Sequence, residues 1–505
     1  MTVLASGDRH RRFQVHCPRF RRSVLRLVGI ALLALVTSVS AHGDPARARL
    51  VAAIDAVVER PALAHAFWGI EVRSLGNGET LYERNADKGF RPASTLKLVT
   101  TAAALDVFGP EERLRTTVET AGRLDGRGRV LGDVFLVGRG DPSLSGRFDG
   151  GSPTAAFEAM AAALVEAGVR RVEGRLVGHE GAFGGDRRGA DWMLEDLAWG
   201  YGAEVSALSF NDNAVHVTLT PGERPGDPAV LEVVPRTSFV RVESTVATGA
   251  PGTEEDVVLD RPLGANRVRL SGVLPPGGEW NEEVAVEDPA LFAVTVFAEV
   301  LQAKGIAVTG GLATSSNPLP AGARVLAVHD GVPMARLIEE VNKESQNLHA
   351  ELLLRRLGLQ ARGEGTTEKG LEAVEEFLDR LAVSHAGWVL KDGSGLSHTN
   401  VLTPRGLVAL LVAMHRHSRA EVFRASLAVS GVSGQLDQRM RGTPGEARVA
   451  AKTGAMQRVN ALAGYVTTER GEPLAFAIMV NNHAELSATA KAAIDDIAIL
   501  LATTP

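Results

Sequence analysis

Three short strings of the sequence carry groups that can break an amide bond through a serine acyl-enzyme. They are Ser94-Thr-Leu-Lys97, Ser345-Gln-Asn347 and Lys452-Thr-Gly454, and they occur in this order along a chain of 505 residues. Together they supply a nucleophile, proton carriers and a grip for a carboxylate. A Ser-x-x-Lys string alone is weak evidence for this chemistry, because about one such string is expected by chance in a chain of this length. The order and setting of the three strings carry the argument.

The first string lies where a helix is expected to begin. Pro92 favours a helix start, and the apolar and Ala-rich run after Lys97 propagates the helix. Residues three apart share a helix face, so Lys97 is expected beside Ser94. A partly desolvated lysine in that position can act as a neutral amine and take the serine proton. An ordinary helix with a surface lysine is the competing interpretation of this string alone.

The second string separates two helical patterns, at 334–343 and 348–354. The polar triplet is therefore expected to project from a helix junction. Ser345 is placed to relay a proton to the leaving amine, and Asn347 to hydrogen-bond the substrate backbone. A helix cap is the plainer explanation of Ser345 taken by itself.

The third string precedes two apolar runs, 461–466 and 474–480, that flank a polar turn. This pattern predicts an antiparallel hairpin with Lys452 on the adjoining strand. A strand beside the nucleophile can pair with an extended peptide and offer an N–H group to an oxyanion. A second strand pair is predicted at 67–73 and 79–83, and a last helix at about 485–501.

With these motifs in this order, the chain resembles the D-alanyl-D-alanine carboxypeptidases/endopeptidases of the low-molecular-mass class C penicillin-binding proteins, serine peptidase family S13. The resemblance covers most of the chain. Further strings that carry it include Gly140-Asp-Pro142, Trp199-Gly-Tyr201 and Asp392-Gly-Ser-Gly-Leu-Ser397. The long gap between Lys97 and Ser345 is another family mark, since inserted domains fill it there.

The resemblance implies the roles of the individual residues. Ser94 is the expected nucleophile and Lys97 its expected base. The N–H groups of Ser94 and Ala455 form the expected oxyanion hole. The remaining catalytic residues are Ser345, Asn347 and Lys452, and the residues that hold the substrate are Thr453, Gly454, Ala455, Asp141 and His398. No metal and no cofactor are implied.

The resemblance also implies an α+β fold. A penicillin-recognising serine transpeptidase/β-lactamase-like domain, with an antiparallel sheet flanked by helices, is split by a large β-rich insert that forms accessory domains. Short Val-rich runs broken by Gly and Pro between about 116 and 320 agree with such an insert. The expected limits are 45–115 and 330–505 for the catalytic domain, 116–175 and 265–325 for accessory domain II, and 176–264 for a nested domain III.

Two positions depart from the family pattern. Relatives usually carry a second hydroxyl after Lys-Thr-Gly, where this chain has Ala455, so the grip on a terminal carboxylate is expected to be weaker. Relatives also commonly carry arginine where this chain has His398. That arginine helps recognise the charged end of a diaminopimelate side chain, together with an acid that Asp141 resembles. A turn residue before Pro142 is the alternative role for Asp141.

Charge and cysteine content bear on the compartment. The formal charge of −6 is spread without long runs, so a nucleic-acid partner is not expected. A basic stretch at 19–26, an apolar run at 27–36 and the small-residue end at Ala41 predict a signal peptide over residues 1–41. Cleavage there removes Cys17, the only cysteine. We expect an exported protein, periplasmic in a Gram-negative source, without a stable membrane anchor.

Two other classes of function remain open beside a serine DD-peptidase. A serine β-lactamase needs a dedicated deacylating group, and no Glu-x-x-Leu-Asn string occurs between Asn347 and Lys452. A catalytically weak peptidoglycan-binding or scaffolding protein would not need Ser94 and Lys97 at their spacing. The expected partners are therefore peptidoglycan stem peptides as substrates and β-lactam antibiotics as covalent inhibitors.

Overall fold

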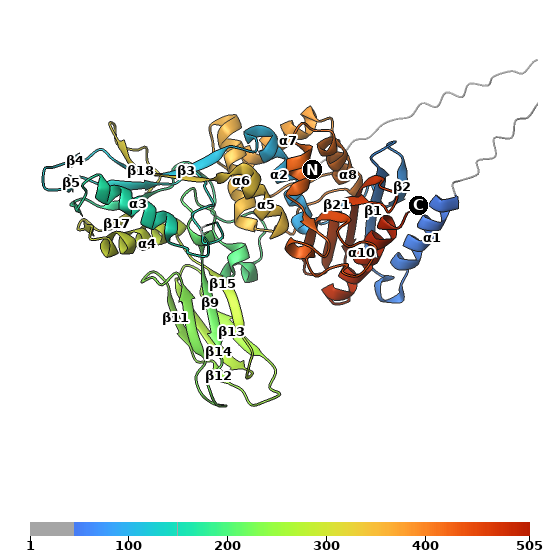
Figure 1. Cartoon of the computed structure of the whole chain (residues 1–505), viewed down its shortest axis with the longest axis horizontal. Helices are drawn as coiled ribbons and strands as arrows, with labels where there is room; N and C mark the ends of the chain where they lie inside the picture. Colours follow the sequence, from blue (N-terminus) through green and yellow to red (C-terminus); the bar gives the residue numbers. More distant parts are fainter. Residues whose placement is uncertain (1–44, 149, 505) are drawn as a thin grey trace, which may run out of the picture. The chain divides into compact units, whose positions relative to one another are not determined.

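The two ends of the described chain meet in one antiparallel sheet (Figure 1). The computed structural model describes residues 45–148 and 150–504, so the predicted signal peptide lies outside the described residues. The order of strands in the sheet is β19-β20-β21-β22-β1-β2. Their bounds are β1 (Phe67–Ser74), β2 (Thr80–Arg84), β19 (Ala428–Val429), β20 (Val449–Met456), β21 (Val459–Thr467) and β22 (Pro473–Asn481).

The pairing within this sheet confirms both predicted strand pairs. β21 and β22 form the antiparallel hairpin, β20 pairs with β21, and β1 pairs with both β2 and β22. The turn at 468–472 closes the hairpin through a hydrogen bond from Thr468 N to Glu472 O of 2.9 Å. Lys452 therefore lies on the strand beside the hairpin, as the sequence pattern predicted.

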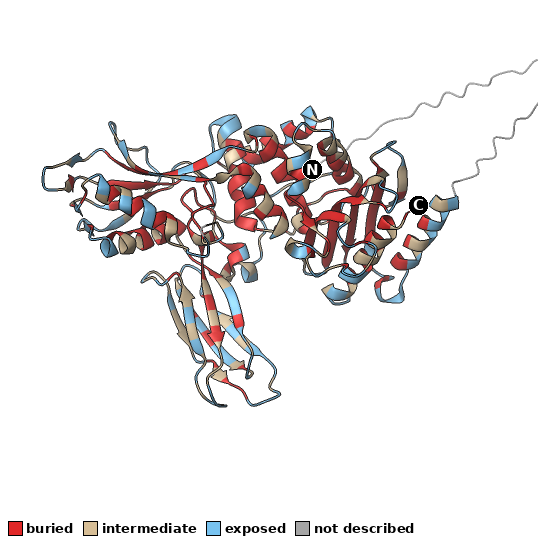
Figure 2. Ribbon diagram, viewed as in Figure 1, coloured by how far each residue is buried: buried red, intermediate tan, exposed pale blue. Residues whose placement is uncertain are grey.

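The two faces of the sheet pack against different sets of helices (Figure 2). Successive side chains of a strand point to opposite faces. On β22, Phe476 and Ile478 pack with α1 and α10, whereas Ala475 and Ala477 face the core that α8 covers. The predicted last helix is confirmed as α10. The helices of this domain are α1 (Pro45–Val58), α2 (Lys97–Phe108), α5 (Met334–Lys343), α6 (Asn347–Arg362), α7 (Thr367–Arg380), α8 (Pro404–His415), α9 (Ala420–Ala425) and α10 (Ser487–Ala502).

The insert begins and ends on neighbouring strands. β3 leaves the catalytic domain after α2, β18 returns to α5, and the two pair antiparallel in a sheet of order β17-β8-β6-β3-β18. A second, smaller sheet has the order β16-β7-β5-β4. The bounds are β3 (Arg113–Thr120), β4 (Arg123–Leu124), β5 (Arg129–Leu131), β6 (Val134–Val137), β7 (Arg171–Val172), β8 (Leu176–His179), β16 (Ala307–Val308), β17 (Leu312–Ser315) and β18 (Arg324–Pro333).

The insert contains helices as well as the strands that its sequence pattern predicted. Two helices, α3 (Ala155–Glu166) and α4 (Pro289–Ala303), pack in its core. α4 begins at Asp288, whose side chain accepts a hydrogen bond from Leu291 N, and Pro289 occupies the first helical position.

Short 3-10 turns occur in both the catalytic domain and the insert: η1 (Pro61–Leu63), η2 (Ala93–Leu96), η3 (Leu194–Ala198), η4 (Gly200–Gly202), η5 (Asn211–Asn213) and η6 (Gly434–Leu436).

The nested part of the insert is built from two further sheets, drawn in green to yellow in Figure 1. The orders are β10-β9-β15 and β11-β14-β12, and β13 also pairs with β14. The bounds are β9 (Ala214–Thr220), β10 (Val230–Val234), β11 (Arg241–Ser244), β12 (Ala247–Thr248), β13 (Asp256–Asp260), β14 (Arg267–Leu274) and β15 (Trp280–Ala285).

These pairings cut across the expected limits of 176–264 for the nested domain. β8, at 176–179, pairs with β6 and β17 of the first insert sheet, whereas β14 and β15, beyond 264, pair with β11 and β9. A boundary inside a hydrogen-bonded sheet would leave backbone groups unpaired. We therefore propose that the nested domain contains β9 to β15, and that β8 belongs to accessory domain II.

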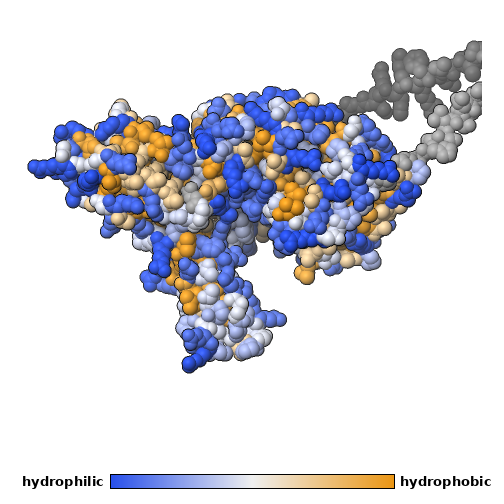
Figure 3. Space-filling model, viewed as in Figure 1, coloured by the Kyte–Doolittle hydropathy of each residue, from blue (hydrophilic) through white to orange (hydrophobic). Residues whose placement is uncertain are grey.

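The face of the molecule in Figure 3 is mostly polar, with apolar side chains in small scattered groups. Leu486 and Leu194 are among the most exposed large apolar side chains, at 80% and 68%. Within the part of the chain that the structure describes, no helix combines the length and the apolar character needed to cross a bilayer.

Candidate active site

Ser94 lies in the 3-10 turn η2, directly before α2 (Lys97–Phe108). The sequence predicted a helix start here, and the structure makes its first turn 3-10. The backbone around Ser94 is tightly enclosed. A Cβ added to Gly395 would lie 2.0 Å from Ala93 O, and one added to Gly454 would lie 2.8 Å from Pro92 O. The absence of side chains at these two glycines lets a loop and strand β20 approach the nucleophile.

Lys97 is completely buried, and its Nζ contacts three oxygen atoms. It lies 2.8 Å from Ser94 Oγ, 2.6 Å from Asn347 Oδ1 and 2.7 Å from the Ser394 carbonyl oxygen. The last two atoms can only accept hydrogen bonds. A neutral amine that donates its two N–H groups to them therefore has its lone pair free for the hydroxyl proton of Ser94.

The electrostatic setting of Lys97 favours this neutral form. Burial lowers the pKa of Lys97 to about 7, although the nearby carboxylates of Asp392 and Glu351 act in the opposite direction. A pKa close to neutrality suits a general base. Lys97 therefore has both the position and the proton affinity to activate Ser94.

Ser345 and Lys452 form a second polar pair in the site. Ser345 lies at the junction of α5 and α6, with φ of 66°, and Lys452 Nζ donates to its Oγ at 2.9 Å. Lys452 also donates to the Thr453 carbonyl oxygen at 2.9 Å. Burial, and then the charge of Lys97, lowers the pKa of Lys452 well below its usual value. An arriving substrate carboxylate would supply a compensating negative charge.

Ser94, Ser345 and Asn347 open onto a cavity of about 630 Å³. Four of the sequence-predicted residues beside Ser94 line it, and residues of the insert close one side. The lining residues are Ser94, Met193, Glu195, Asp196, Tyr201, Glu344, Ser345, Asn347, Gly395, Leu396, His398, Gln435, Ala455, Met456 and Gln457. Residues of the first two motifs and Ala455, which follows the third motif, thus surround one space and come from η2, the α5–α6 junction and strand β20.

Strand β20 offers part of its edge to this cavity. β19 pairs only with Ala450 and Ala451, so among the described residues no strand covers the same edge from Lys452 onward. An extended peptide can pair with an uncovered strand edge. Ala455, the expected oxyanion donor, lines the cavity on this stretch.

The hydroxyl of Thr453 is already engaged. Thr453 Oγ1 donates to Gln435 Oε1 at 2.6 Å, and Gln435 Nε2 donates to the Glu344 carbonyl oxygen at 3.2 Å. Gln435 belongs to the string Gly431-Val-Ser-Gly434-Gln435, which has no obvious catalytic pattern. The sequence therefore did not indicate that this side chain lies beside the expected carboxylate grip.

Asp141 does not lie at the cavity, contrary to the role expected for it. It is 1% exposed. Its Oδ1 accepts hydrogen bonds from Ser143 N at 2.9 Å and Ser143 Oγ at 2.7 Å, and its Oδ2 lies 3.7 Å from His329 Nε2. The bonds to Ser143 agree with the alternative interpretation of the sequence, in which Asp141 stabilises a turn. His398, by contrast, does line the cavity.

The insert supplies a different acid. Asp196 in η3 lines the cavity together with Tyr201 in η4, whose hydroxyl donates to Asp196 Oδ1 at 3.2 Å. Asn347 Nδ2 donates to the Tyr201 carbonyl oxygen at 2.8 Å, so the same side chain contacts the insert and Lys97. The Trp199-Gly-Tyr201 string pointed to this segment, but no local pattern distinguished Asp196 from other acids.

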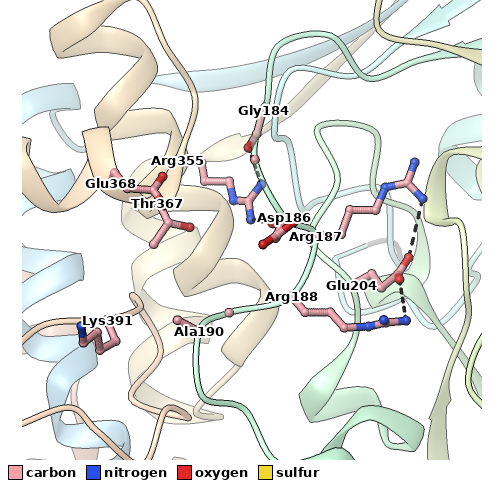
Figure 4. A pocket seen from close by; sticks show the side chains of 12 residues that line it. Gly184, Asp186, Arg187, Arg188, Ala190, Glu204, Arg355, Thr367, Glu368 and Lys391 are labelled. Carbon is pink, nitrogen blue, oxygen red and sulfur yellow. Dashed lines mark hydrogen bonds and ion pairs between the residues drawn. The ribbon is translucent and has the colours of Figure 1, made fainter.

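A second cavity, also of about 630 Å³, lies where the 184–190 loop approaches α6 and α7 (Figure 4). Its arginines are largely occupied by internal partners. Arg187 and Arg188 pair with Glu204, and Arg355 donates to the carbonyl oxygens of Gly184 and Asp186. None of the three motifs lines this cavity, so it is separate from the serine site.

Comparison with known proteins identifies the family. The model of the peptidase S13 family, described as the D-Ala-D-Ala carboxypeptidase 3 (S13) family, matches residues 50–503. The chain belongs to this family. A D-alanyl-D-alanine carboxypeptidase from Actinomadura sp. (strain R39) is 38% identical over 500 residues, which cover 95% of this chain and 90% of that protein. The S13 chain is accordingly a serine DD-peptidase.

Solved structures agree with the fold. Penicillin-binding protein 4 (DacB) from Haemophilus influenzae matches with a TM-score of 0.76 and 23% identity, over 89% of this chain and 98% of that one. A structure of the same H. influenzae protein complexed with a β-lactam matches with a TM-score of 0.71 and 21% identity, over the same shares of the two chains. These similarities show the α+β penicillin-binding fold.

The geometry around Lys97 predicts a pH dependence. If the neutral amine of Lys97, whose pKa is about 7, acts as the base, kcat/KM for a D-Ala-D-Ala peptide is expected to fall below pH 7 and to level off above it. Lys97→Arg keeps the charge but removes the neutral form, so the rate is expected to fall roughly two or more orders of magnitude. Steady-state kinetics across pH measure both effects.

Lys369→Arg is the matched control, because Lys369 on α7 pairs with Glu372 away from the cavity. It is expected to leave the pH profile unchanged. A Lys97→Arg enzyme with a near-parental rate would show that Lys97 acts only as a charge and that another group takes the proton.

Proposed function

We propose that this S13 peptidase cleaves D-Ala-D-Ala stem peptides and D-centred cross-links of peptidoglycan through an acyl-enzyme on Ser94. The 2.8 Å contact between Ser94 Oγ and the buried Lys97 Nζ carries this assignment. Lys97 takes the hydroxyl proton while Oγ attacks the amide carbonyl carbon. The C–N bond breaks, and the leaving amine receives a proton. Water then attacks the ester, the C–O bond to Ser94 breaks, and the hydroxyl is restored.

The negative charge that forms on the carbonyl oxygen needs preorganised donors. We assign this role to the backbone N–H groups of Ser94 and Ala455. The close approach of η2 and β20 at Gly454 supports this assignment, because it brings the two backbone segments to the same cavity.

The leaving amine needs a proton, and the Ser345 hydroxyl is the proposed donor. Its Oγ accepts a hydrogen bond from Lys452 Nζ at 2.9 Å, so the lysine can restore the proton that the serine gives away. Asn347 has a separate role, because its carbonyl oxygen holds Lys97. Its amide nitrogen is engaged by the Tyr201 carbonyl oxygen, so the predicted contact of Asn347 with the substrate backbone would require this bond to be exchanged.

β-Lactams are the proposed covalent inhibitors. Their ring opens by the same serine attack, but the leaving group stays attached and blocks the approach of water. A β-lactamase would need a dedicated deacylating base, for which the sequence offers no candidate string. A pure binding or scaffolding role would not require a buried lysine in contact with the serine hydroxyl. Mass spectrometry of products from monomeric and cross-linked muropeptides would distinguish peptidase activity from such a role.

Benzylpenicillin is expected to form a persistent adduct at Ser94, because no dedicated group assists its hydrolysis. Ser94→Ala is expected to abolish the adduct while the fold remains intact. Intact-protein mass spectrometry measures the adduct. Ser238→Ala, in the insert, is the control, since the hydroxyl and N–H of Ser238 donate to Glu299 Oε1 and Ser238 is not among the residues that line the cavity. An adduct on the Ser94→Ala protein would refute the assignment of the nucleophile.

We propose that this chain binds the terminal carboxylate of a substrate weakly. Ala455 has no hydroxyl, and the hydroxyl of Thr453 is engaged by Gln435 at 2.6 Å. Hydrogen bonds to a charged group contribute about 1.5–3 kcal/mol. Substrates that end in a free D-alanine carboxylate at this position are therefore disfavoured. Cross-linked substrates, whose distal chain makes other contacts, suffer less, so we propose that endopeptidase activity exceeds carboxypeptidase activity.

Ala455→Thr is expected to raise kcat/KM on a D-Ala-D-Ala pentapeptide by about tenfold, if the lower-end bond energy is recovered in the transition state. A cross-linked dimer is expected to show a smaller change. Ala455→Val, which adds similar bulk without a hydroxyl, is the control. Equal gains on both substrates, or no gain on the pentapeptide, would show that Ala455 does not set the preference.

Export is the remaining proposal, because peptidoglycan lies outside the cytoplasm. The basic and apolar stretches before Ala41 support a cleaved signal peptide, and periplasmic location follows in a Gram-negative source. The mature chain is expected to begin at His42, which N-terminal sequencing of protein from an exported fraction checks. A chain that retains residues 1–41 in that fraction would contradict cleavage.

A further inference from the structure

A buried glutamate on α6, one turn after Asn347, has no part in the reaction described above. Glu351 is 1% exposed. Its carboxylate accepts hydrogen bonds from the backbone N–H groups of Gly393, at 3.0 and 3.1 Å, and of Ser394, at 2.8 Å. The carbonyl group of Ser394 is the one that accepts from Lys97 Nζ at 2.7 Å. A single residue therefore connects Glu351 to an acceptor of the catalytic amine.

The same loop is held from its other side by α2. Thr100 Oγ1, one turn after Lys97, donates to the Gly393 carbonyl oxygen at 2.7 Å. Thr100 and Ser394 are both buried. The backbone at 393–394 is thus bonded to a carboxylate on α6 and to a hydroxyl on α2, and Gly395 N, in the same peptide unit as the Ser394 carbonyl group, donates to Asp392 Oδ1 at 2.8 Å. Together these bonds fix the direction of the Ser394 carbonyl group.

The direction of this carbonyl group has a chemical consequence. A neutral amine has two N–H groups, and the acceptors Asn347 Oδ1 and Ser394 O together place its lone pair toward Ser94 Oγ. If the Ser394 carbonyl group turned away, the amine could rotate and donate to Ser94 instead. The lysine would then remain beside the nucleophile without being aligned to take its proton.

We propose that Glu351 is a positioning residue, which aligns the lone pair of Lys97 by holding the backbone of the loop that carries the Ser394 carbonyl group. This inference rests on the proposed function, because it concerns the same proton transfer. It assigns a second role to α6, which carries Asn347 at its start and the loop-binding carboxylate one turn later.

The charged groups around Lys97 and Glu351 determine in which direction the pH dependence of acylation moves when Glu351 is changed. The charged side chains that act on Lys97 are Glu351 on α6, Asp392 in the loop and Lys452 on β20. Asp392 and Arg355 act on Glu351. Burial and Asp392 raise the pKa of Glu351 to about 7, while its bonds from Ser394 and Gly393 act to lower it. A negative Glu351 stabilises the Lys97 ammonium, so removing this charge lowers the pKa of Lys97.

The test uses the second-order rate constant of acylation by benzylpenicillin across pH in the full-length protein. Glu351→Gln is expected to lower the alkaline plateau by about tenfold or more, because an NH₂ group, which cannot accept from Gly393 N–H, would replace Oε2, and the remaining amide oxygen is a weaker acceptor than a carboxylate. The acid limb of the pH profile, which is the range where the rate constant falls as the pH decreases, is also expected to move to lower pH. Thr100→Val, which removes the neutral bond, is expected to lower the plateau without moving the limb. The fraction of protein that finally acquires an adduct is expected to stay at the parental value in both variants.

Glu71→Gln is the matched control, because Glu71 is a fully buried acid on β1 that pairs with Arg73 and Arg405. It is expected to leave both plateau and limb unchanged. A Glu351→Gln plateau within twofold of the parent would overturn the inference. A lowered plateau in Glu351→Gln with the acid limb at the parental pH would also overturn the inference, because a merely structural role predicts that result. If Glu351→Gln does not fold, an unchanged plateau in Thr100→Val overturns it. Absence of acylation in the parent would instead refute the proposed function.

Discussion

The burial of one lysine without a direct carboxylate partner is the constraint on which the site depends. Removing an ammonium group from water is costly, and the protein offers Lys97 carbonyl oxygens instead of an ion pair. The charge is therefore easily lost, and the pKa of Lys97 falls to about 7. An ion pair at the same place would hold the proton and remove the base. The low pKa of Lys97 thus comes from what surrounds the lysine, more than from the lysine itself.

This environment is assembled from segments far apart in the chain. η2 carries the serine, α6 carries Asn347, a loop carries the Ser394 carbonyl group, and β20 brings Lys452. The large insert does not disturb this assembly because it leaves and returns on paired strands. Arg113 at the start of β3 pairs with Pro333 at the end of β18, so the two connections to the catalytic domain lie side by side. An insert with adjacent ends adds little strain to its host.

The insert is nevertheless part of the site. Tyr201 accepts a hydrogen bond from Asn347, and Trp192 Nε1 donates to Asp392 Oδ2 at 3.0 Å in the loop that holds Ser394. These contacts join the insert to two segments that surround Lys97. Residues of η3 and η4 also close one side of the cavity. The insert therefore shapes the space into which a substrate fits, as well as adding domains.

The sequence by itself determined the features that depend on nearby residues. The spacing of Ser94 and Lys97, the hairpin of β21 and β22, and α10 follow local periodicity and turn chemistry, and resemblance to a family supplied the order of the motifs. Only the tertiary structure decided that the acids at the cavity are Glu195, Asp196 and Glu344 and that Asp141 is not among them. It also decided which strands of the insert pair with one another and how far Lys97 is desolvated. Each of these depends on long-range pairing and burial, which no short stretch of sequence encodes.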